Sequence, residues 1–245
     1  MKKTSDKITI IAELHPQHGG DINELKRMIL QCAVGGADGA KVQLYSSQLL
    51  FGDDRRKDYE ISFEELEIIK VYADNIGIDL LASVFDVSRI DWCEKLGFKY
   101  YKIASRSSED RYLCETIIQT GKPIFISVNL REGQGFPYPS NNVNYFYCVS
   151  SYPALLEQIS IPKFERGGYI GFSDHTIGLT ASKTAIVNGA KYIEKHMTLS
   201  KAFQSSLNKG HLGAMDMDDL SDLRRFSEEF VRIGKDAKYS YGFKS

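Results

Sequence analysis

The sequence predicts an α/β protein, a single domain over residues 1–245 folded as a (β/α)8 barrel, or TIM barrel. Short apolar runs alternate with helical patterns along the chain, and this repetition is typical of a parallel sheet. Eight strands fit within 245 residues, the usual size of such a barrel. A doubly wound open sheet is the alternative. It requires a glycine-rich phosphate loop after an early strand, and Gly19 and Gly20 are too short a signal for one.

Each strand is expected at a short apolar run that polar or turn-forming residues follow. In chain order the expected strands cover residues 8–14, 39–44, 79–83, 99–103, 123–128, 143–149, 168–176 and 191–197. Because every strand but one is followed by a helical pattern, the strands are expected to run parallel.

Seven helices are expected in the eight connections, at residues 22–34, 62–75, 87–96, 110–120, 154–164, 177–188 and 216–233. Asp21 is the expected N-cap of the first helix, and Ser62 and Glu65 have capping-box spacing at the second. Gly189 is a stop signal for the helix before the last strand. The connection between the fifth and sixth strands, residues 131–142, is rich in glycine and proline and is expected to be irregular.

The composition argues against several classes of partner. The net charge is -1, and no basic stripe indicates binding to nucleic acid or to an anionic membrane. No apolar segment approaches the length of a membrane span, and the chain starts without a signal-peptide pattern. The four cysteines lack CxxC spacing, so free thiols are expected. A cytoplasmic protein is therefore predicted.

Two histidines close to the ends of the last two strands form a candidate metal site. Side chains alternate faces along a strand, so Ser173 shares a face with His175, and Glu194 shares one with His196. One helix separates these strands, which makes them parallel neighbours about 4.8 Å apart and brings the two histidines together. The pair can hold one divalent metal ion. The alternative is two core histidines with ordinary hydrogen-bond partners.

Two lysines inside apolar strands, Lys41 and Lys102, are the second unusual feature, because a buried unpaired ammonium group is costly. They require an anion, which is either an internal carboxylate, Glu13 or Glu194, or an anionic substrate. Several other polar residues stand at or beyond strand ends: Gln43, Ser83, Ser105, Ser127, Ser150, Tyr152 and Ser173. Lysines together with hydroxyl groups suit a phosphate. These residues predict a metal-dependent barrel enzyme acting on a phosphorylated or carboxylated small molecule.

Several segments together resemble the N-acetylneuraminate (sialic acid) synthase family. The resemblance runs in order from about Ile10 to Leu223, and the segments at Gly171–Gly178 (GFSDHTIG) and Ile193–Leu199 (IEKHMTL) are the most specific. The weaker segments are Ile11–Leu14, Gly36–Gln43, Lys102–Ser105, Gly121–Pro123 and Tyr152–Pro153.

The resemblance implies a (β/α)8 barrel that condenses phosphoenolpyruvate with an aldose or N-acylhexosamine such as N-acetylmannosamine. The products are phosphate and a 2-keto-3-deoxy sugar acid. A divalent metal, Mn²⁺ or Mg²⁺, would be held by His175 and His196 and would polarise the sugar aldehyde. Phosphoenolpyruvate would be bound by Lys41, Ser83, Lys102, Ser105, Ser127, Ser150, Tyr152 and Ser173. Glu13 would contact the sugar beside Gln43, and His211 matches a residue of the family's late loop.

The chain departs from the family pattern chiefly in the sugar half of the site. Arg106 and Ser107 stand where the family usually has Gly-Glu, so the acid is missing, and Glu109 or Asp110 is its expected replacement. The late loop, Lys209–Ala214, keeps His211 but has Gly210 where the family has the sugar-binding Asp.

Two further departures concern a loop and the C-terminus. In Gln17–Gly20 only His18 is retained, either to contact substrate or as a solvated loop residue. Residues 234–245 are too few for the C-terminal antifreeze-like domain of the family, so the barrel domain alone is expected. The oligomeric state stays open: a homodimer is one alternative, but the family dimerises largely through that domain.

Two other functions stay open at this point. The first is a barrel that binds a sugar or anion, or depends on a partner, without turnover. The second is an aldolase that forms a Schiff base, which would require one desolvated lysine rather than two. The charged run 53–58 is expected to be a solvated loop, with Arg55 or Arg56 able to fold over a bound anion.

Overall fold

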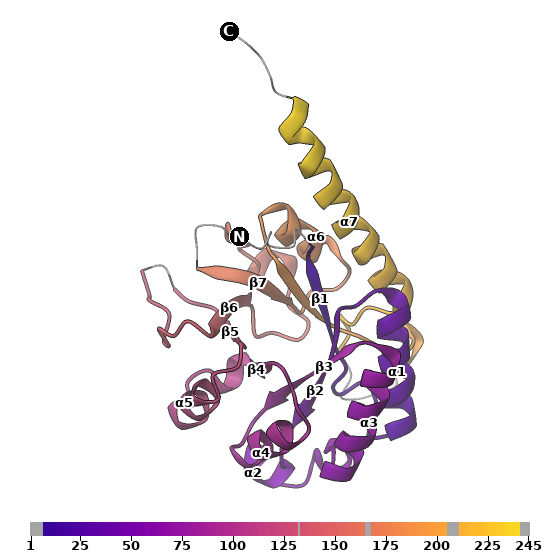
Figure 1. The fold of residues 1–245 in the computed structure, drawn as a ribbon, viewed down its shortest axis with the longest axis vertical. Coiled ribbons are helices and arrows are strands. Elements are labelled where there is room, and N and C mark those ends of the chain that lie inside the picture. Colours follow the sequence, from indigo (N-terminus) through magenta and orange to yellow (C-terminus); the bar gives the residue numbers. More distant parts are fainter. Residues whose placement is uncertain (1–6, 132, 165–167, 205–210, 241–245) are drawn as a thin grey trace.

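The computed structural model describes residues 7–131, 133–164, 168–204 and 211–240, without the side chains of residues 203 and 235–240. Eight parallel strands close into a barrel in chain order, with the last strand paired to the first (Figure 1). The strands are β1 (Thr9–Glu13), β2 (Gly39–Leu44), β3 (Asp79–Val84), β4 (Tyr101–Ile103), β5 (Ile124–Val128), β6 (Val143–Cys148), β7 (Tyr169–Asp174) and β8 (Tyr192–His196). The predicted fold class is confirmed.

Helices surround the barrel, and α1, α3 and α7 lie side by side along one part of it (Figure 1). The helices are α1 (Ile22–Gly35), α2 (Ser47–Phe51), α3 (Phe63–Ile76), α4 (Ser88–Lys95), α5 (Arg111–Gln119), α6 (Thr180–Val187) and α7 (Met217–Ser240). Asp21 caps α1, and Ser62 and Glu65 form the predicted capping box of α3. Among the described residues, no helix is long and apolar enough to cross a membrane.

The prediction of a helix over residues 154–164 is wrong. The connection from β6 to β7 contains only a 3₁₀ turn, Leu156–Gln158, in its described part. Pro162 lacks the N–H that an α-helix would use and restricts the residue before it, and the β-branched Ile159 and Ile161 favour extended backbone. The connection from β5 to β6 has no helix in its described residues, as predicted.

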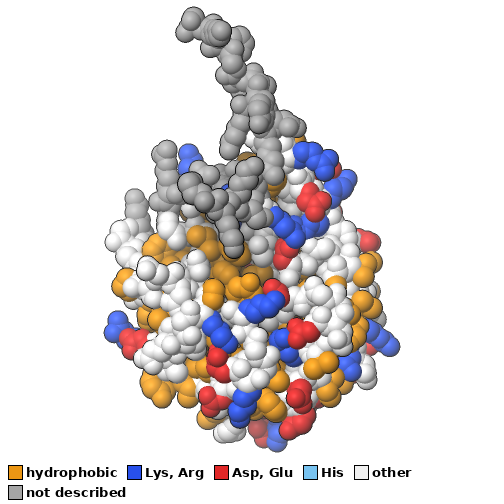
Figure 2. Space-filling view, in the orientation of Figure 1, with side chains coloured by type: hydrophobic (Ala, Val, Ile, Leu, Met, Phe, Trp, Pro, Cys, Tyr) orange, Lys and Arg blue, Asp and Glu red, His pale blue; other side chains and the backbone are white. Residues whose placement is uncertain are grey.

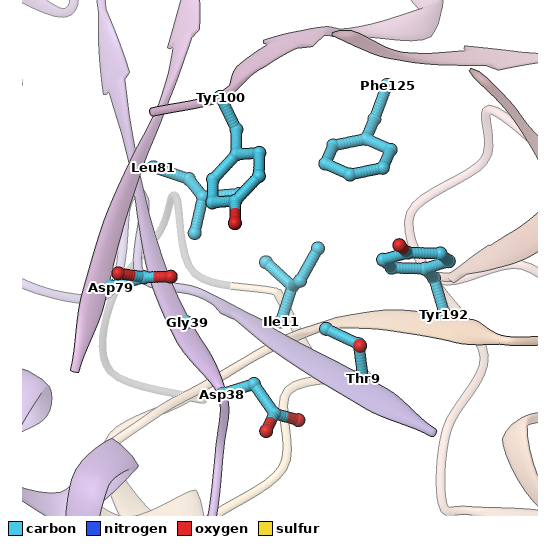
Figure 3. Close-up of a pocket in the computed structure, with 9 residues that line it drawn as sticks. All are labelled: Thr9, Ile11, Asp38, Gly39, Asp79, Leu81, Tyr100, Phe125 and Tyr192. Carbon is cyan, nitrogen blue, oxygen red and sulfur yellow. The ribbon is translucent and has the colours of Figure 1, made fainter. Parts of the chain in front are cut away.

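The N-terminal end of the barrel is filled by apolar side chains. Ile11, Leu81, Phe125 and Phe146 form an internal cluster, separate from the larger core between strands and helices. A small pocket of about 180 Å³ lies at this end. The rings of Tyr100, Phe125 and Tyr192 lie around Ile11 in it (Figure 3).

The two acids at the rim of that pocket have structural partners. Asp38 pairs with Arg224 and Lys7, and Asp79 pairs with Lys99. On the face of the molecule in Figure 2, acidic and basic side chains are likewise interspersed. The N-terminal end of the barrel therefore serves packing, which leaves the C-terminal end for chemistry.

Asp174 on β7 and Lys195 on β8 face outward and join the barrel to its outer layer. Lys195 donates to the Thr176 carbonyl at 2.6 Å and lies 3.2 Å from Asp174, and both charged side chains are fully buried. Asp174 also accepts hydrogen bonds from Ser182 on α6 and from Thr176. Such a pair is destabilising to break, since the remaining charge stays buried without its partner.

We predict that Lys195→Met lowers the free energy of unfolding by about 3–5 kcal/mol, because it leaves the Asp174 carboxylate unpaired. Urea denaturation measures the change. Lys201→Met is the control: Lys201 pairs with Asp219 at 2.5 Å but is half exposed, so its loss should cost less than about 1 kcal/mol. Equal effects of the two substitutions would contradict this description.

Candidate active site

A cluster of two lysines and two glutamates lies inside the C-terminal half of the barrel. Lys41 donates to the carboxylate of Glu13 on the adjacent strand and to the hydroxyl of Ser83 at 2.8 Å, and it lies 3.8 Å from Glu194. All these side chains are almost fully buried. Burial alone would lower the pKa of Lys41, but the two carboxylates raise it, so the ammonium group stays charged.

The second lysine has fewer anionic partners. Lys102 donates to Ser127 at 2.7 Å and to the Ile103 carbonyl at 3.1 Å, and its nearest carboxylate, Glu194, is 3.8 Å away. Burial lowers the pKa of Lys102, with Glu194 opposing the shift. Burial likewise opposes ionisation of Glu194, but Lys102 and Lys41 lower its pKa overall. In this state the internal carboxylates are the anions that the sequence required.

Three of the predicted serines contact these charges. Ser83 and Ser127 accept from the two lysines, and Ser173 donates to Glu194 at 3.0 Å. The other two, Ser150 and Ser105, lie in the turns after β6 and β4, where Ser150 donates to Ser105 at 2.7 Å. The structure therefore brings three of the five serines to the buried charges, and pairs the remaining two with each other.

A cluster of three histidines and one tyrosine covers the mouth of the barrel. The rings of His175 and His196 are 5.7 Å apart, as the βαβ unit predicted, and His211 lies 3.9 Å from His196. The ring centre of Tyr152 lies 4.1 Å from that of His175 and 4.5 Å from that of His211, and the Tyr152 ring is tilted by 34° to each of them. Burial lowers the pKa of His175 and of His211 to about 4, so both rings are neutral near pH 7.

The histidine pair offers nitrogen lone pairs that suit a metal ion, but the described residues do not complete a set of ligands. His175 Nδ1 lies 2.9 Å from the Val149 carbonyl, which only accepts, so Nδ1 carries the proton and Nε2 keeps its lone pair. Metal-binding histidines commonly donate their second nitrogen in this way. His196 Nδ1 is buried without a hydrogen-bond partner among the described residues. Over the described ranges, however, no three His, Cys, Asp or Glu side chains are arranged to hold a metal.

Two more histidines, His15 and His18, lie beside this cluster, so all five histidines of the chain lie at one end of the barrel. His18 is buried, which rules out the solvated alternative, and its Nδ1 accepts from Gly20 N at 3.1 Å. Burial lowers the pKa of His18 to about 4 and that of His15 well below its usual range. Sequence reasoning missed His15, although it directly follows the expected strand 8–14, and the signal used for Ser150, a polar residue beyond a strand end, could have found it.

A hollow of about 410 Å³ lies over the same end of the barrel. Its lining includes the predicted Gln43, Ser105, Ser150, Tyr152 and His211. Arg56, one of the two arginines expected to be able to fold over a bound anion, also lines it, and the residues that sequence reasoning did not assign to it are His15, Pro16, Phe51, Phe85, Ala104 and Arg106. A substrate reaching the buried lysines would extend into this hollow.

The expected replacements for the missing acid do not enter this hollow. Asp110 accepts from Leu113 N at 3.0 Å and caps α5, so its carboxylate has a structural role. Glu109 lines a neighbouring hollow that shares only Ser105 with this one. Ser107 is buried, and Gly210 lies outside the described residues.

Buried charges, hydroxyls and histidines at the C-terminal ends of the strands define this chain as a barrel of the class that carries its chemistry at that end. The chain belongs to the NeuB family, whose sequence profile matches residues 28–237. Among its relatives is an uncharacterized protein of Methanocaldococcus jannaschii, 31% identical over 210 residues that cover 78% of this chain and 62% of the relative.

Several relatives are named synthases. Human N-acetylneuraminate-9-phosphate synthase is 27% identical, over 88% of this chain and 68% of its own length. A pseudaminic acid synthase of Campylobacter jejuni is 26% identical, over 95% and 77% of the two chains. The chain thus spans 62% of the Methanocaldococcus relative and 68% of the human one.

The fold is also that of a solved structure, the N-acetylneuraminic acid (sialic acid) synthetase of Leptospira borgpetersenii. The TM-score is 0.84 at 24% identity, over 98% of this chain and 87% of the other. At this identity the likeness concerns the fold.

We predict that the neutral histidines make stability depend on pH. His18 has a pKa of about 4 in the folded protein and about 6.5 when unfolded, so the unfolded state binds more protons between these values. The stability that follows from burying His18 in its neutral form is fully present above about pH 6.5 and is lost as the pH falls toward 4. In chemical denaturation, the unfolding free energy of wild type should fall more steeply than that of His18→Gln, by up to about 1.4 kcal/mol per pH unit. Parallel curves would show that His18 is not buried neutral.

Proposed function

We propose that this protein condenses phosphoenolpyruvate with a sugar aldehyde, an aldose or an N-acylhexosamine resembling N-acetylmannosamine, in a metal-dependent reaction that releases phosphate. The product is a 2-keto-3-deoxy sugar acid of the sialic acid type. The observation that carries the proposal is the pair of buried lysines, Lys41 and Lys102, surrounded by hydroxyl groups next to a cluster of neutral histidines.

Phosphoenolpyruvate suits the lysine half of the site because it carries two anionic groups, a carboxylate and a phosphate. On binding, these groups compete with Glu13 and Glu194 for the two ammonium groups. Charge-assisted hydrogen bonds are about twice as strong as neutral ones, which offsets the cost of burying the substrate. The hydroxyls that complete this half are those of Ser83, Ser105, Ser127, Ser150 and Ser173.

The sugar aldehyde suits the outer half, where Gln43, Tyr152 and His211 offer hydrogen-bonding groups. Glu13 belongs to the buried cluster but also accepts from the backbone N–H of His15, a residue that lines the hollow. In the reaction we propose, C3 of phosphoenolpyruvate attacks the aldehyde carbon, and the aldehyde oxygen becomes a hydroxyl. Positive charge develops at C2, where water adds, and the C2–O bond to phosphate then breaks. All atoms of the two substrates and one water are accounted for in the keto acid and inorganic phosphate.

His175 and His196 are the residues that would hold Mn²⁺ or Mg²⁺, with their neutral rings supplying lone pairs. A bound ion supplies Lewis-acid polarisation of the aldehyde oxygen. The protein's own part is to keep His175 in one tautomer through the Val149 carbonyl and to seat the aldehyde beside the buried lysines.

The relatives support this proposal through their names, which include synthases of N-acetylneuraminate 9-phosphate, N,N'-diacetyllegionaminic acid and pseudaminic acid. A second candidate is a homologue that binds a sugar or anion without turnover, or only with a partner. Ser107 in place of the family's acid favours it. Turnover by the purified chain decides between the two.

We expect the purified protein with Mn²⁺ to consume phosphoenolpyruvate and release phosphate in the presence of a sugar acceptor. A chelator should abolish the reaction, and added Mn²⁺ should restore it. His196→Ala should reduce kcat/KM by at least about 100-fold, because metal-directed polarisation is lost. Release that is insensitive to both chelator and substitution would contradict the metal role. The absence of release with every acceptor would favour the binding role.

Lys102→Met tests the phosphoenolpyruvate half directly. Removing one charge-assisted contact should weaken equilibrium binding of phosphoenolpyruvate, measured by calorimetry, by about 10- to 100-fold. Lys99→Met is the matched control, because Lys99 pairs with Asp79 near the opposite end of the barrel. This variant should bind phosphoenolpyruvate with the affinity of wild type. Unchanged affinity of Lys102→Met would remove this lysine from the site.

A further inference from the structure

The hollow over the barrel mouth contains two arginines and no acidic side chain. Arg56 and Arg106 are among its lining residues, and none of the other residues that line it is a lysine, an aspartate or a glutamate. Neither arginine forms an ion pair within the described part of the chain. This half of the site thus carries a positive charge for which the described residues supply no ion-pair partner.

Arg56 is held in place by its backbone rather than by its charge. Its N–H donates to Ser47 Oγ at 3.0 Å, and its carbonyl accepts from the Tyr45 hydroxyl at 3.2 Å. The guanidinium lies 5.6 Å from the Tyr59 ring centre, and its Nη1 is buried with no hydrogen-bond partner among the described residues. A buried guanidinium nitrogen without a partner is costly, which favours a ligand at this position.

Arg106 approaches the same hollow from the turn after β4. Its guanidinium lies 5.0 Å from the ring centre of Phe51, another lining residue. Arg56 and Arg106 line the same hollow as Gln43, Tyr152 and His211, the residues assigned above to the sugar half of the site. Both arginines therefore face the region where the sugar acceptor would lie.

The neighbouring Arg55 provides a contrast within the same loop. It also approaches the Phe51 ring, at 5.4 Å, but its side chain pairs with Asp53 at 3.0 Å and does not line the hollow. The family resemblance indicates a glutamate beside Arg106, where this chain has Ser107. A glutamate there would repel an anion, whereas arginines bind phosphates and carboxylates, often through two parallel hydrogen bonds.

We propose, building on the synthase activity proposed above, that the sugar acceptor of this protein carries an anionic group, a phosphate or a carboxylate, at the end remote from its aldehyde. Arg56 and Arg106 bind that group. The aldehyde then lies at His175 and His196, and the charged end occupies the hollow. The arginines select the acceptor, while Lys41 and Lys102 serve phosphoenolpyruvate.

Matched pairs of acceptors test this assignment. Phosphoenolpyruvate consumption is followed by its ultraviolet absorbance with N-acetylmannosamine and its 6-phosphate, with arabinose and its 5-phosphate, and with glucose and glucuronate. We expect kcat/KM to be at least about 10-fold higher for the charged member of a productive pair. The phosphate and carboxylate arms show which anion is preferred. Equal use of both members, or preference for the neutral one, would overturn the proposal while leaving the synthase activity intact.

Variants separate acceptor binding from phosphoenolpyruvate binding. Arg56→Gln and Arg106→Gln should each raise KM for the charged acceptor about 10- to 100-fold, with little change for its neutral partner or for phosphoenolpyruvate. Arg55→Gln should match wild type. A rise in KM for phosphoenolpyruvate instead would assign the arginines to that substrate and overturn the proposal.

A binding assay that needs no turnover distinguishes failure of the proposed synthase activity from failure of the proposed arginine site. If no acceptor supports consumption of phosphoenolpyruvate, the synthase activity fails, and thermal shift assays with arabinose 5-phosphate and arabinose still test the arginine site. Stabilisation by the phosphorylated sugar that is lost in Arg56→Gln and Arg106→Gln, but kept in Arg55→Gln, would support the site. Equal shifts in all variants would overturn it.

Discussion

The buried charge cluster of Lys41, Lys102, Glu13 and Glu194 is the interaction on which the site depends. Four ionisable side chains inside a barrel are tolerated only because the charges balance and hydroxyls supply further hydrogen bonds. The glutamates keep Lys41 charged without consuming all its hydrogen-bonding capacity. In the proposed reaction, an incoming anion competes with the glutamates for these ammonium groups, which the cluster keeps charged and in place.

Side chains alternate between the two faces of the sheet along β7 and β8, so each of the two segments that most specifically resemble the family contributes residues to both faces. Ser173 and Glu194 face the interior and belong to the charge cluster, while Asp174 and Lys195 face outward and join the strands to α6. These segments therefore carry both residues of the candidate site and the attachment of the outer layer. The opposite end of the barrel is filled with aromatic rings (Figure 3), and the acids at its rim are paired with Lys99 and Arg224.

Periodicity and caps predicted the closed barrel, its eight strands and six of the seven expected helices, because those features depend on local pattern. The helix expected over residues 154–164 was wrong, since a proline and β-branched residues outweigh a weak apolar pattern. The inward lysines, serines and histidine pair followed from strand alternation. His15 was missed, and Arg56 was expected only as one of two arginines able to fold over a bound anion, because the position of a loop residue depends on tertiary packing, which no local pattern encodes.

The most direct test of the charge cluster is a crystal structure of the protein with bound phosphoenolpyruvate. This account predicts that the ammonium groups of both Lys41 and Lys102 contact the ligand's phosphate or carboxylate within hydrogen-bond distance. The hydroxyls of Ser83 and Ser127 should lie beside it. A structure in which both lysines keep only Glu13 and Glu194 as anionic partners, with the ligand bound elsewhere, would contradict it.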